Sequence, residues 1–344
     1  MQVIRHYQHV APEARGAVVT LGNFDGVHRG HQAVVARTAA LADEMGVPLG
    51  VMIFEPHPRT YFRPDAPPFQ LTTFHAKARL LERLGVDYLY VIGFDASIAA
   101  KSPQDFVIDV LVKGVGVSHL VVGYDFAFGK NRTGDVSVLG WMGTMEGFGL
   151  TTVEPIVRPG EGEANGQVFS STLIRERIHG GNMRGAADLL GHWWAIEGHV
   201  RHGDRRGRTI GFPTLNVGLP HLVVPKFGVY AVWVELSGSE AAGKPAQVLP
   251  GVANLGVRPT FDKTEPLLEI HLLDYSGDLY GRQIRASLID FIRPERKFDG
   301  LESLKAQIAL DAEAARRILA EDGARLDFFD DGLDAIAAHS RTRV

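Results

Sequence analysis

Two histidines, His28 and His31, lie three residues apart at the end of a glycine-rich segment, residues 21–31. An apolar run over residues 17–21 precedes this segment, and helical spacing follows it over residues 32–44. A strand, a glycine-rich turn and a helix N-terminus together place backbone N–H groups and a positive dipole end where an anion can bind. Imidazole donors at that turn suit the charge that develops on a phosphate during nucleotidyl transfer. The sequence therefore predicts a nucleotide-phosphate site with His28 and His31 as its catalytic residues.

A plainer interpretation is that His28 and His31 cap the helix or supply two ligands of a metal site. An H-x-x-H pair alone is a weak signal, but the flanking strand and glycines favour the anion site. Gly22, Gly26 and Gly30 allow tight turns and a close approach of the backbone to a ligand.

A second cluster of hydroxyl groups, Ser170-Ser171-Thr172, precedes a helical run that carries Arg175 one turn later. Serine and threonine at such a position are ordinary N-caps. An arginine on the same turn suits phosphate recognition, because its planar fork binds phosphate oxygens in pairs. We expect Ser171, Thr172 and Arg175 to bind a nucleotide phosphate.

Thr214 and Asn216 are two residues apart, so on a strand their side chains share one face. A hydroxyl and an amide oxygen there can bind Mg²⁺, which takes few protein ligands. The loop 203–208, with Gly207, has glycines and basic residues suited to covering a phosphate. Glu269 alternates with apolar residues, so its carboxylate points away from the core and could accept a proton from a hydroxyl. By spacing alone, an exposed glutamate of no function is the better interpretation.

The elements that must position these residues change in pattern along the chain. Up to about residue 188, strands alternate with helices, which indicates an α/β domain with a parallel sheet. The predicted strands are 17–21, 47–54, 88–92 and 119–122, and the predicted helices are 32–44, 73–84, 103–112 and 171–179.

From about residue 195 the chain shows short β runs separated by turn residues, which is typical of an antiparallel barrel or sandwich. The runs are 228–236, 247–254, 267–273 and 285–292, and a helical period returns over 301–319. We expect two domains, 1–187 and 188–344, the second ending in a helix.

Composition excludes several classes of protein. The 344 residues are 45% hydrophobic and 22% charged, with a net charge of -4, which is ordinary for a globular protein and argues against a basic nucleic-acid groove. The absence of cysteine excludes disulfides and thiolate chemistry. No signal-like or membrane-length apolar run occurs. We expect a cytoplasmic protein with small-molecule substrates, no nucleic-acid or membrane partner, and an oligomeric state that the sequence leaves open.

These motifs resemble those of the bacterial bifunctional riboflavin kinase/FAD synthetase family over roughly residues 15–315. The likeness to its FMN adenylyltransferase half rests on GNFDGVHRGH, FEPHP (54–58), VGYDFAFG (122–129) and SSTLIRERI (170–178). The likeness to its kinase half rests on GRTIGFPTLN (207–216), KFGVYAV (226–232), GVANLGVRPTF (251–261) and LEIHLLDYSGDLYG (268–281). The resemblance implies a Rossmann-like nucleotidyltransferase domain and an antiparallel β-barrel kinase domain. It also implies that ATP phosphorylates riboflavin to FMN, and that a second ATP adenylylates FMN to FAD with release of pyrophosphate.

The resemblance also implies roles for individual residues. Glu269 becomes the general base of the kinase, which reverses the interpretation from spacing alone, and Mg²⁺ becomes the cofactor. The implied sites are His28 and His31 on the ATP phosphates; Gly22, Asn23, Gly30, Ser171, Thr172, Arg175 and Gly207 in ATP or phosphate binding; Asp25, Phe62, Asp125 and Phe128 at the flavin; and Thr214 and Asn216 at the metal.

One departure and two alternatives stand beside this hypothesis. The family usually has a small residue between the Thr and Asn of its PTxN motif, whereas this chain has Leu215, whose side chain we expect on the opposite face. The protein could instead adenylylate another phosphorylated acceptor, with a passive β domain, or could be a non-catalytic flavin carrier. The presence of His28, His31, Thr214, Asn216 and Glu269 speaks against a carrier, which does not need them.

Overall fold

The structure is a computed structural model that describes residues 1–156, 168–201, 211–219, 221–236, 247–259 and 264–321. These residues form two compact units. Unit 1 contains Met1–Pro67 and Phe74–Ser170, and unit 2 contains Pro68–Thr73 and the described residues from Ser171 to Glu321. The chain thus passes into unit 2 after Ser170, and the domain boundary predicted at 187/188 stays a prediction.

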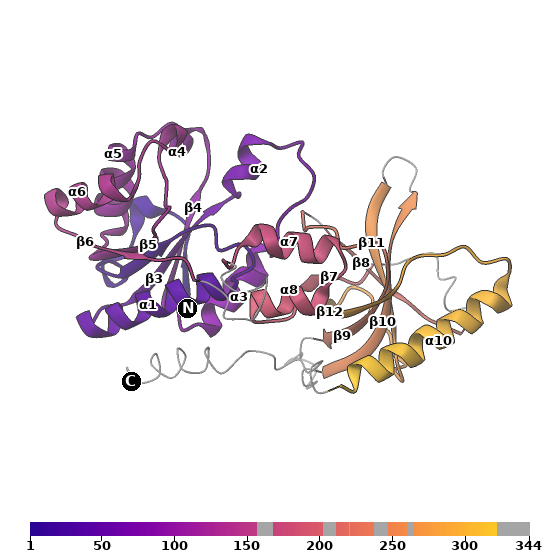
Figure 1. The fold of residues 1–344 in the computed structure, drawn as a ribbon. Helices are drawn as coiled ribbons and strands as arrows, with labels where there is room; N and C mark the ends of the chain where they lie inside the picture. The colour runs from indigo at the N-terminus through magenta and orange to yellow at the C-terminus, as the bar shows by residue number, and fades with distance from the viewer. Residues whose placement is uncertain (157–167, 202–210, 220, 237–246, 260–263, 322–344) are drawn as a thin grey trace. The chain divides into compact units, whose positions relative to one another are not determined.

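Unit 1 is built on a parallel six-stranded sheet in the order β1-β4-β3-β2-β5-β6 (Figure 1). Its central strands are buried on both faces, which explains why they are continuous apolar runs in the sequence. The strands are β1 (Gln2–Ile4), β2 (Val18–Leu21), β3 (Leu49–Glu55), β4 (Tyr88–Gly93), β5 (His119–Gly123) and β6 (Gly149–Val153). The α-helices are α1 (Arg29–Met45), α2 (Pro58–Phe62), α3 (Phe74–Arg83), α4 (Ala96–Ala99), α5 (Pro103–Asp105) and α6 (Val136–Glu146). The predicted α/β class with a parallel sheet is confirmed.

The order of these strands reverses at β2. Strand β2 pairs with β3 on one side and with β5 on the other. In open parallel sheets, such a switch point leaves a crevice at the carboxyl ends of the strands, where ligands bind. The glycine-rich segment leaves β2 at this point and leads into α1, which packs against β2, β3 and β5.

One predicted helix takes an unusual form. After α5 the chain continues as a π-helical segment, η3 (Phe106–Val115), where the sequence predicts a helix over 103–112. The guanidinium of Arg15 donates hydrogen bonds to the carbonyl oxygens of Val112 at 3.2 Å and Lys113 at 3.0 Å, and also to that of Gly114. These bonds satisfy carbonyl groups at the end of the segment.

Unit 2 contains an antiparallel six-stranded sheet in the order β7-β12-β9-β10-β11-β8. The strands are β7 (Ala195–His199), β8 (Leu215–Gly218), β9 (Gly228–Leu236), β10 (Gln247–Pro259), β11 (Thr264–Leu272) and β12 (Gln283–Arg293). The N–H of Arg201, just after β7, donates to the carbonyl of Asn216 on β8 at 2.9 Å, so the two edges meet and the sheet is nearly a closed barrel. The predicted antiparallel barrel is confirmed.

Three helices accompany this barrel: α7 (Ser171–His179), α8 (Met183–Leu190) and α10 (Leu301–Leu319). Helix α10, at the yellow end of the colour scale, lies along β9, β10 and β12 (Figure 1). Trp193 belongs to the core between these elements, and the indole N–H of Trp194 donates to the Leu71 carbonyl at 2.8 Å. Among the helices that the structure describes, none is both long enough and apolar enough to cross a membrane.

Candidate active sites

In unit 2, the predicted metal ligand Asn216 and the predicted base Glu269 are direct cross-strand partners between β8 and β11. Directly opposed residues of an antiparallel pair project from the same face. The neighbours of Glu269 in its strand, Leu268 and Ile270, are fully buried on the other face. Thr214 comes two residues before Asn216, immediately before β8. The predicted alternation is therefore present along β11, whereas Thr214 lies just outside β8.

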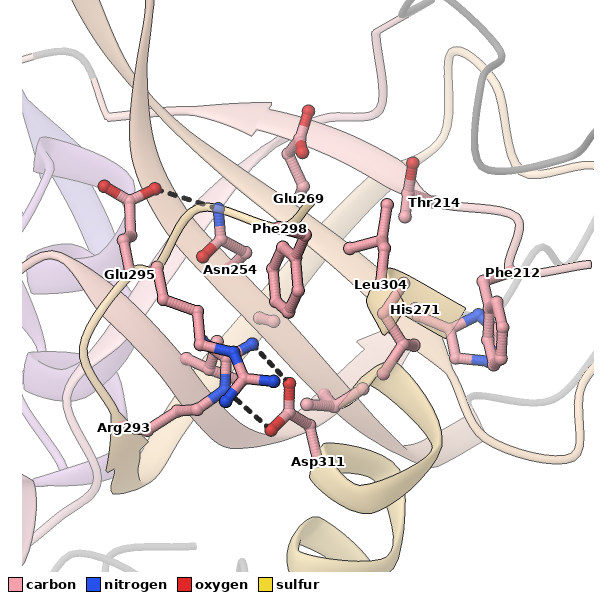
Figure 2. A pocket seen from close by; sticks show the side chains of 15 residues that line it. Phe212, Thr214, Asn254, Glu269, His271, Arg293, Glu295, Phe298, Leu304 and Asp311 are labelled. Atoms are coloured by element: carbon pink, nitrogen blue, oxygen red, sulfur yellow. Dashed lines mark hydrogen bonds and ion pairs between the residues drawn. The ribbon is translucent and has the colours of Figure 1, made fainter. Parts of the chain in front are cut away.

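A cavity of about 280 Å³ opens beside this face (Figure 2). Glu269 and Thr214 lie in the upper part of the view, and Phe298 and Leu304 are drawn below them (Figure 2). The wall combines apolar side chains from the barrel and α10 with a few polar groups, as is usual for small-molecule sites. Its further lining residues are Phe212, Val229, Val252, Ala253, Asn254, His271, Arg293, Glu295, Arg296, Ile308 and Asp311.

An ion pair between two lining residues, Arg293 and Asp311, lies in the lower part of Figure 2 and joins β12 to α10. Arg293 donates from Nε to Oδ1 of Asp311 at 2.8 Å and from Nη2 to Oδ2 at 2.6 Å. Asp311 is only 4% exposed, and Gln307 donates a further hydrogen bond to it at 2.8 Å. Bidentate arginine–carboxylate pairs are geometrically specific, so this one fixes the helix that forms a wall of the cavity.

His271 supports the segment that carries Thr214. It lies two residues after Glu269 on β11, and its Nδ1–H donates to the carbonyl oxygen of Pro213 at 3.0 Å. Its ring also meets the ring of Phe212 edge-on, at 5.3 Å between centroids. The sequence suggested no role for His271, because a contact across 58 residues leaves no local signal.

The side chain of Asn216 is suited to a hard cation. It is 4% exposed, and its Oδ1 has no hydrogen-bond partner among the described residues. A buried amide oxygen is costly to leave unpaired, so a ligand for it is expected. The described residues hold no group of three or more His, Cys, Asp or Glu side chains arranged for a metal. The predicted pair, the Thr214 hydroxyl and the Asn216 amide, consists of oxygen donors of the kind that Mg²⁺ takes together with phosphate and water.

In unit 1, His28 and His31 stand side by side at the start of α1. Their rings are stacked with centroids 3.6 Å apart, and Phe24 lies 5.0 Å from His31. His28 is also the N-cap of α1, because its Nδ1 accepts the backbone N–H of His31 at 3.3 Å. The capping alternative therefore describes one function of His28, and the pairing of the rings is additional to it.

His31 is held in its neutral form. Burial lowers the pKa of His31 well below its ordinary value of 6.5, and the charges of His28 and Lys77 lower this pKa further. Its Nδ1 is buried and has no hydrogen-bond partner in the described part of the chain. A neutral imidazole beside a helix N-terminus can donate to a phosphate oxygen without adding a second charge to be desolvated.

A cavity of about 410 Å³ lies at the carboxyl ends of the strands of unit 1. It brings together four predicted residues: Gly22, Asn23, Phe62 and Phe128. Phe62 on α2 is 64% exposed and available for stacking, whereas Phe128 is only 7% exposed and belongs mostly to the core. The other lining residues were not among the predicted site residues, although six of them lie in the motifs 54–58 and 122–129: Phe54, His57, Pro58, Arg59, Phe94, Ile98, Ala99, Phe106, Phe126, Ala127, Gly129, Asn131 and Arg132.

The remaining predicted residues lie elsewhere. Asp25 is buried in the loop and Asp125 is exposed after β5, and neither lines the cavity of unit 1. Gly30 is so close to the His28 ring that an added Cβ would come within 3.1 Å of it. Gly207 lies outside the described residues.

Ser171, Thr172 and Arg175 belong to α7 and therefore to unit 2. There the Nε of Arg175 donates to the carbonyl of Phe69 at 2.7 Å, and its guanidinium lies 5.4 Å from the centre of the Phe69 ring. The Nε edge of the Arg175 guanidinium, which is predicted to bind phosphate, is thus hydrogen-bonded to the backbone.

Comparison with known proteins matches the two parts of the chain to two protein families. The FAD synthetase family model matches residues 10–172, and the riboflavin kinase model matches residues 190–319. A bifunctional riboflavin kinase/FMN adenylyltransferase of Escherichia coli (strain K12) is 45% identical over 318 residues, which cover 92% of this chain and 97% of that protein. The bifunctional riboflavin kinase/FMN adenylyltransferase of Pseudomonas fluorescens is 41% identical over 326 residues, which cover 94% of this chain and 100% of that protein. The corresponding protein of Bacillus subtilis (strain 168) is 39% identical over 321 residues, which cover 91% of this chain and 96% of that protein.

A solved structure described as a macrolide-efflux protein from Streptococcus pneumoniae has the same fold. The TM-score is 0.79 at 30% identity, and the match covers 92% of this chain and 99% of that one.

Proposed function

Because this chain belongs to the bifunctional riboflavin kinase/FMN adenylyltransferase family, we propose that each of its units carries one of the two reactions. The chain phosphorylates riboflavin with ATP to give FMN. It also transfers the adenylyl group of ATP to FMN, giving FAD and pyrophosphate. The proposal assigns phosphorylation to the cavity beside Glu269 and adenylylation to the loop that carries His28 and His31. We also propose that the enzyme works in the cytoplasm, from its composition, and that its partners are these small molecules.

In the kinase reaction, Glu269 acts as general base. It accepts the proton of the terminal ribityl hydroxyl as that oxygen bonds to the γ-phosphorus of ATP and the bond to the β–γ bridging oxygen breaks. The apolar wall of Phe298 and Leu304 suits the isoalloxazine ring, and the Arg293–Asp311 pair holds that wall in place. The observation that carries the assignment is the direct pairing of Asn216 with Glu269, whose side chain lines this cavity.

Thr214 and Asn216 are the residues that would hold Mg²⁺. The buried Oδ1 of Asn216 supports this assignment. The ion would supply neutralisation of phosphate charge when ATP is bound. Leu215, between them in sequence, pairs with Ile270 in the sheet. Its side chain projects from the opposite face, so the departure from the family's usual small residue concerns packing.

In the adenylylation reaction, an oxygen of the FMN phosphate attacks the α-phosphorus of ATP and pyrophosphate leaves. His28, His31 and the first N–H groups of α1 stabilise the charge on that phosphate. Gly22 and Gly30 let the backbone approach it, and Asn23 lines the adjoining cavity.

The aromatic cavity of unit 1 is proposed as the site of the FMN ring. Phe62, which is exposed at its rim, supplies a face for stacking, and Phe128 contributes to the wall. Asp25 and Asp125, which do not line this cavity, stay proposed flavin residues. Ser171, Thr172, Arg175 and Gly207 stay proposed phosphate-binding residues.

The proposal is tested in two separate incubations with ATP and Mg²⁺: one supplied with riboflavin to measure FMN formation, and one supplied with FMN to measure FAD formation, with the flavins separated by chromatography. Glu269→Gln is expected to abolish FMN formation alone, and a His28→Ala/His31→Ala double variant is expected to abolish FAD formation alone. An adenylyltransferase with a passive β domain would form no FMN even in the wild type. A flavin carrier would retain flavin and release no pyrophosphate. Loss of both reactions in either variant would contradict the assignment.

A further inference from the structure

Lys77 on α3 is a buried lysine to which the two proposed reactions give no role. Its side chain is 5% exposed, and its Nζ donates a hydrogen bond to the backbone carbonyl oxygen of Asn23 at 2.7 Å. Burial lowers the pKa of Lys77 from its ordinary value, while the nearby carboxylates of Asp25 and Glu55 act in the opposite direction. A buried ammonium is costly unless it is paired or hydrogen-bonded, so its position under this loop calls for an explanation.

The loop above Lys77 has an unfavourable backbone. Phe24 and Val27 adopt left-handed conformations, with φ of 47° and 43°, although neither is a glycine. Such conformations are unfavourable for residues other than glycine and persist where the surroundings determine them. The residues Asn23 and His28, at the two ends of this strained stretch, are those proposed to face the nucleotide.

Two buried side chains hold the two ends of this stretch. Lys77 binds the carbonyl of Asn23, and Gln32, which is also buried, donates from Nε2 to the carbonyl of Val27 at 2.8 Å. Lys77 differs from Gln32 in carrying a charge. That charge is close enough to His31 to lower the pKa of its imidazole.

We propose that Lys77 is a positioning residue for adenylyl transfer: its buried ammonium holds the Asn23 end of the strained loop and places a fixed positive charge behind His31. This inference rests on the proposed role of His28 and His31. The charge acts together with burial to keep His31 neutral, and it adds to the positive potential that a triphosphate meets at the helix N-terminus.

The test compares Lys77→Met, which keeps the length of the side chain without its charge, with Lys77→Arg, which keeps the charge. Lys101→Met is the matched control, because Lys101 is a partly buried lysine of the same unit that binds Asp109 at 2.6 Å and does not line the cavity. Formation of FAD from FMN is measured for each variant. Formation of FMN from riboflavin in the same sample is the internal control.

Lys77→Met is expected to lower kcat for FAD formation by on the order of 10²-fold, since small displacements of a catalytic group have effects of this size. FMN formation is expected to stay at the wild-type rate, Lys77→Arg to recover most of the loss, and Lys101→Met to match wild type. NMR titration of the histidine rings supplies a readout that a purely structural role would leave unchanged. The pKa of His31 is expected to rise in Lys77→Met and to stay low in Lys77→Arg.

Wild-type FAD formation by Lys77→Met, or an unshifted pKa of His31 in that variant, would overturn the inference. If Lys77→Met fails to fold, Lys77→Gln provides the same comparison with a neutral donor. The His28→Ala/His31→Ala variant distinguishes a failure of the Lys77 proposal from a failure of the proposed function. If it is inactive in FAD formation while Lys77→Met is normal, only the role of Lys77 is lost; if it is active, the proposed function itself fails.

Discussion

Asn216 on β8 and Glu269 on β11 face each other directly across an antiparallel strand pair. This pairing places an amide oxygen without a hydrogen-bond partner in the described structure on the same face as a carboxylate that lines a cavity. A phosphoryl transfer needs both at one point, because the base must reach the attacking hydroxyl while the metal neutralises the phosphates.

Glu269→Gln is therefore expected to reduce FMN formation by on the order of 10²-fold or more, since the amide cannot accept the proton. Glu265→Gln is the control, because Glu265 is an exposed residue on the same face of β11 that does not line the cavity. Steady-state rates of FMN formation, measured with FMN-to-FAD conversion in the same preparation, provide the check. Equal losses in the two variants would show that the cavity is not the kinase site.

Asn216→Ala is expected to raise the Mg²⁺ concentration needed for half-maximal kinase activity by on the order of tenfold, equivalent to about 1.4 kcal/mol of lost coordination. Leu215→Ala is the control at the neighbouring position, where the side chain projects from the other face of β8. The measurement is a magnesium titration at saturating riboflavin. An unchanged midpoint in Asn216→Ala would remove this residue from the metal site.

Phe62→Ala is expected to raise the KM for FMN in adenylylation by roughly threefold to tenfold, because stacking contributes about 0.5–1.5 kcal/mol. Phe62 is 64% exposed, so stability should change little. Trp141 on α6 is exposed to a similar extent, at 60%, but does not line the cavity, so Trp141→Ala is expected to bind FMN normally. If both substitutions change the KM alike, Phe62 is not a flavin contact.

Asp311→Ala is expected to lower the free energy of unfolding of unit 2 by about 3 kcal/mol, because it leaves the Arg293 guanidinium partly buried without its partner. It should also raise the KM for riboflavin, since α10 forms a wall of the cavity. Arg316, on the same helix, forms an exposed ion pair with Asp274, and Asp274→Ala is expected to have a much smaller effect. Urea denaturation of the two variants compares the pairs, and equal losses would contradict the role given to burial.

The lowered pKa of His31 predicts a pH dependence of stability. The unfolded chain takes up a proton as the pH falls below the ordinary value of 6.5, whereas the folded chain resists protonation. The stability linked to His31 is thus complete above this value and is lost as the pH falls toward the lowered pKa. His31→Gln should lose less stability than wild type over that range. His75→Gln, at an exposed position of α3, should follow wild type in urea denaturation series at each pH.

The sequence predicted the elements whose pattern is local. Strand β9 and helix α10 have the predicted bounds, Gly228–Leu236 and Leu301–Leu319, because alternation and helical period are strong over nine and nineteen residues. The short strands β1 and β6 were not predicted, since few residues give little periodicity.

The sequence motifs predicted the candidate site residues, but they did not predict the long-range contacts that hold these residues in place. The pairing of β8 with β11 joins segments about fifty residues apart, and the Arg293–Asp311 pair joins a strand to a helix. In the sequence, Lys77 is an ordinary polar position of an amphipathic helix. Only the fold brings it beneath the Asn23 carbonyl.

A complementation time course tests the central claim, that one chain holds two separate reaction sites. Riboflavin, ATP and Mg²⁺ are incubated with Glu269→Gln, with His28→Ala/His31→Ala, or with an equimolar mixture of the two, and the three flavins are separated by chromatography. The account predicts that the first variant makes neither product from riboflavin but converts added FMN, that the second stops at FMN, and that the mixture makes FAD. A mixture that makes no FAD, or a single variant defective in both steps, would contradict it.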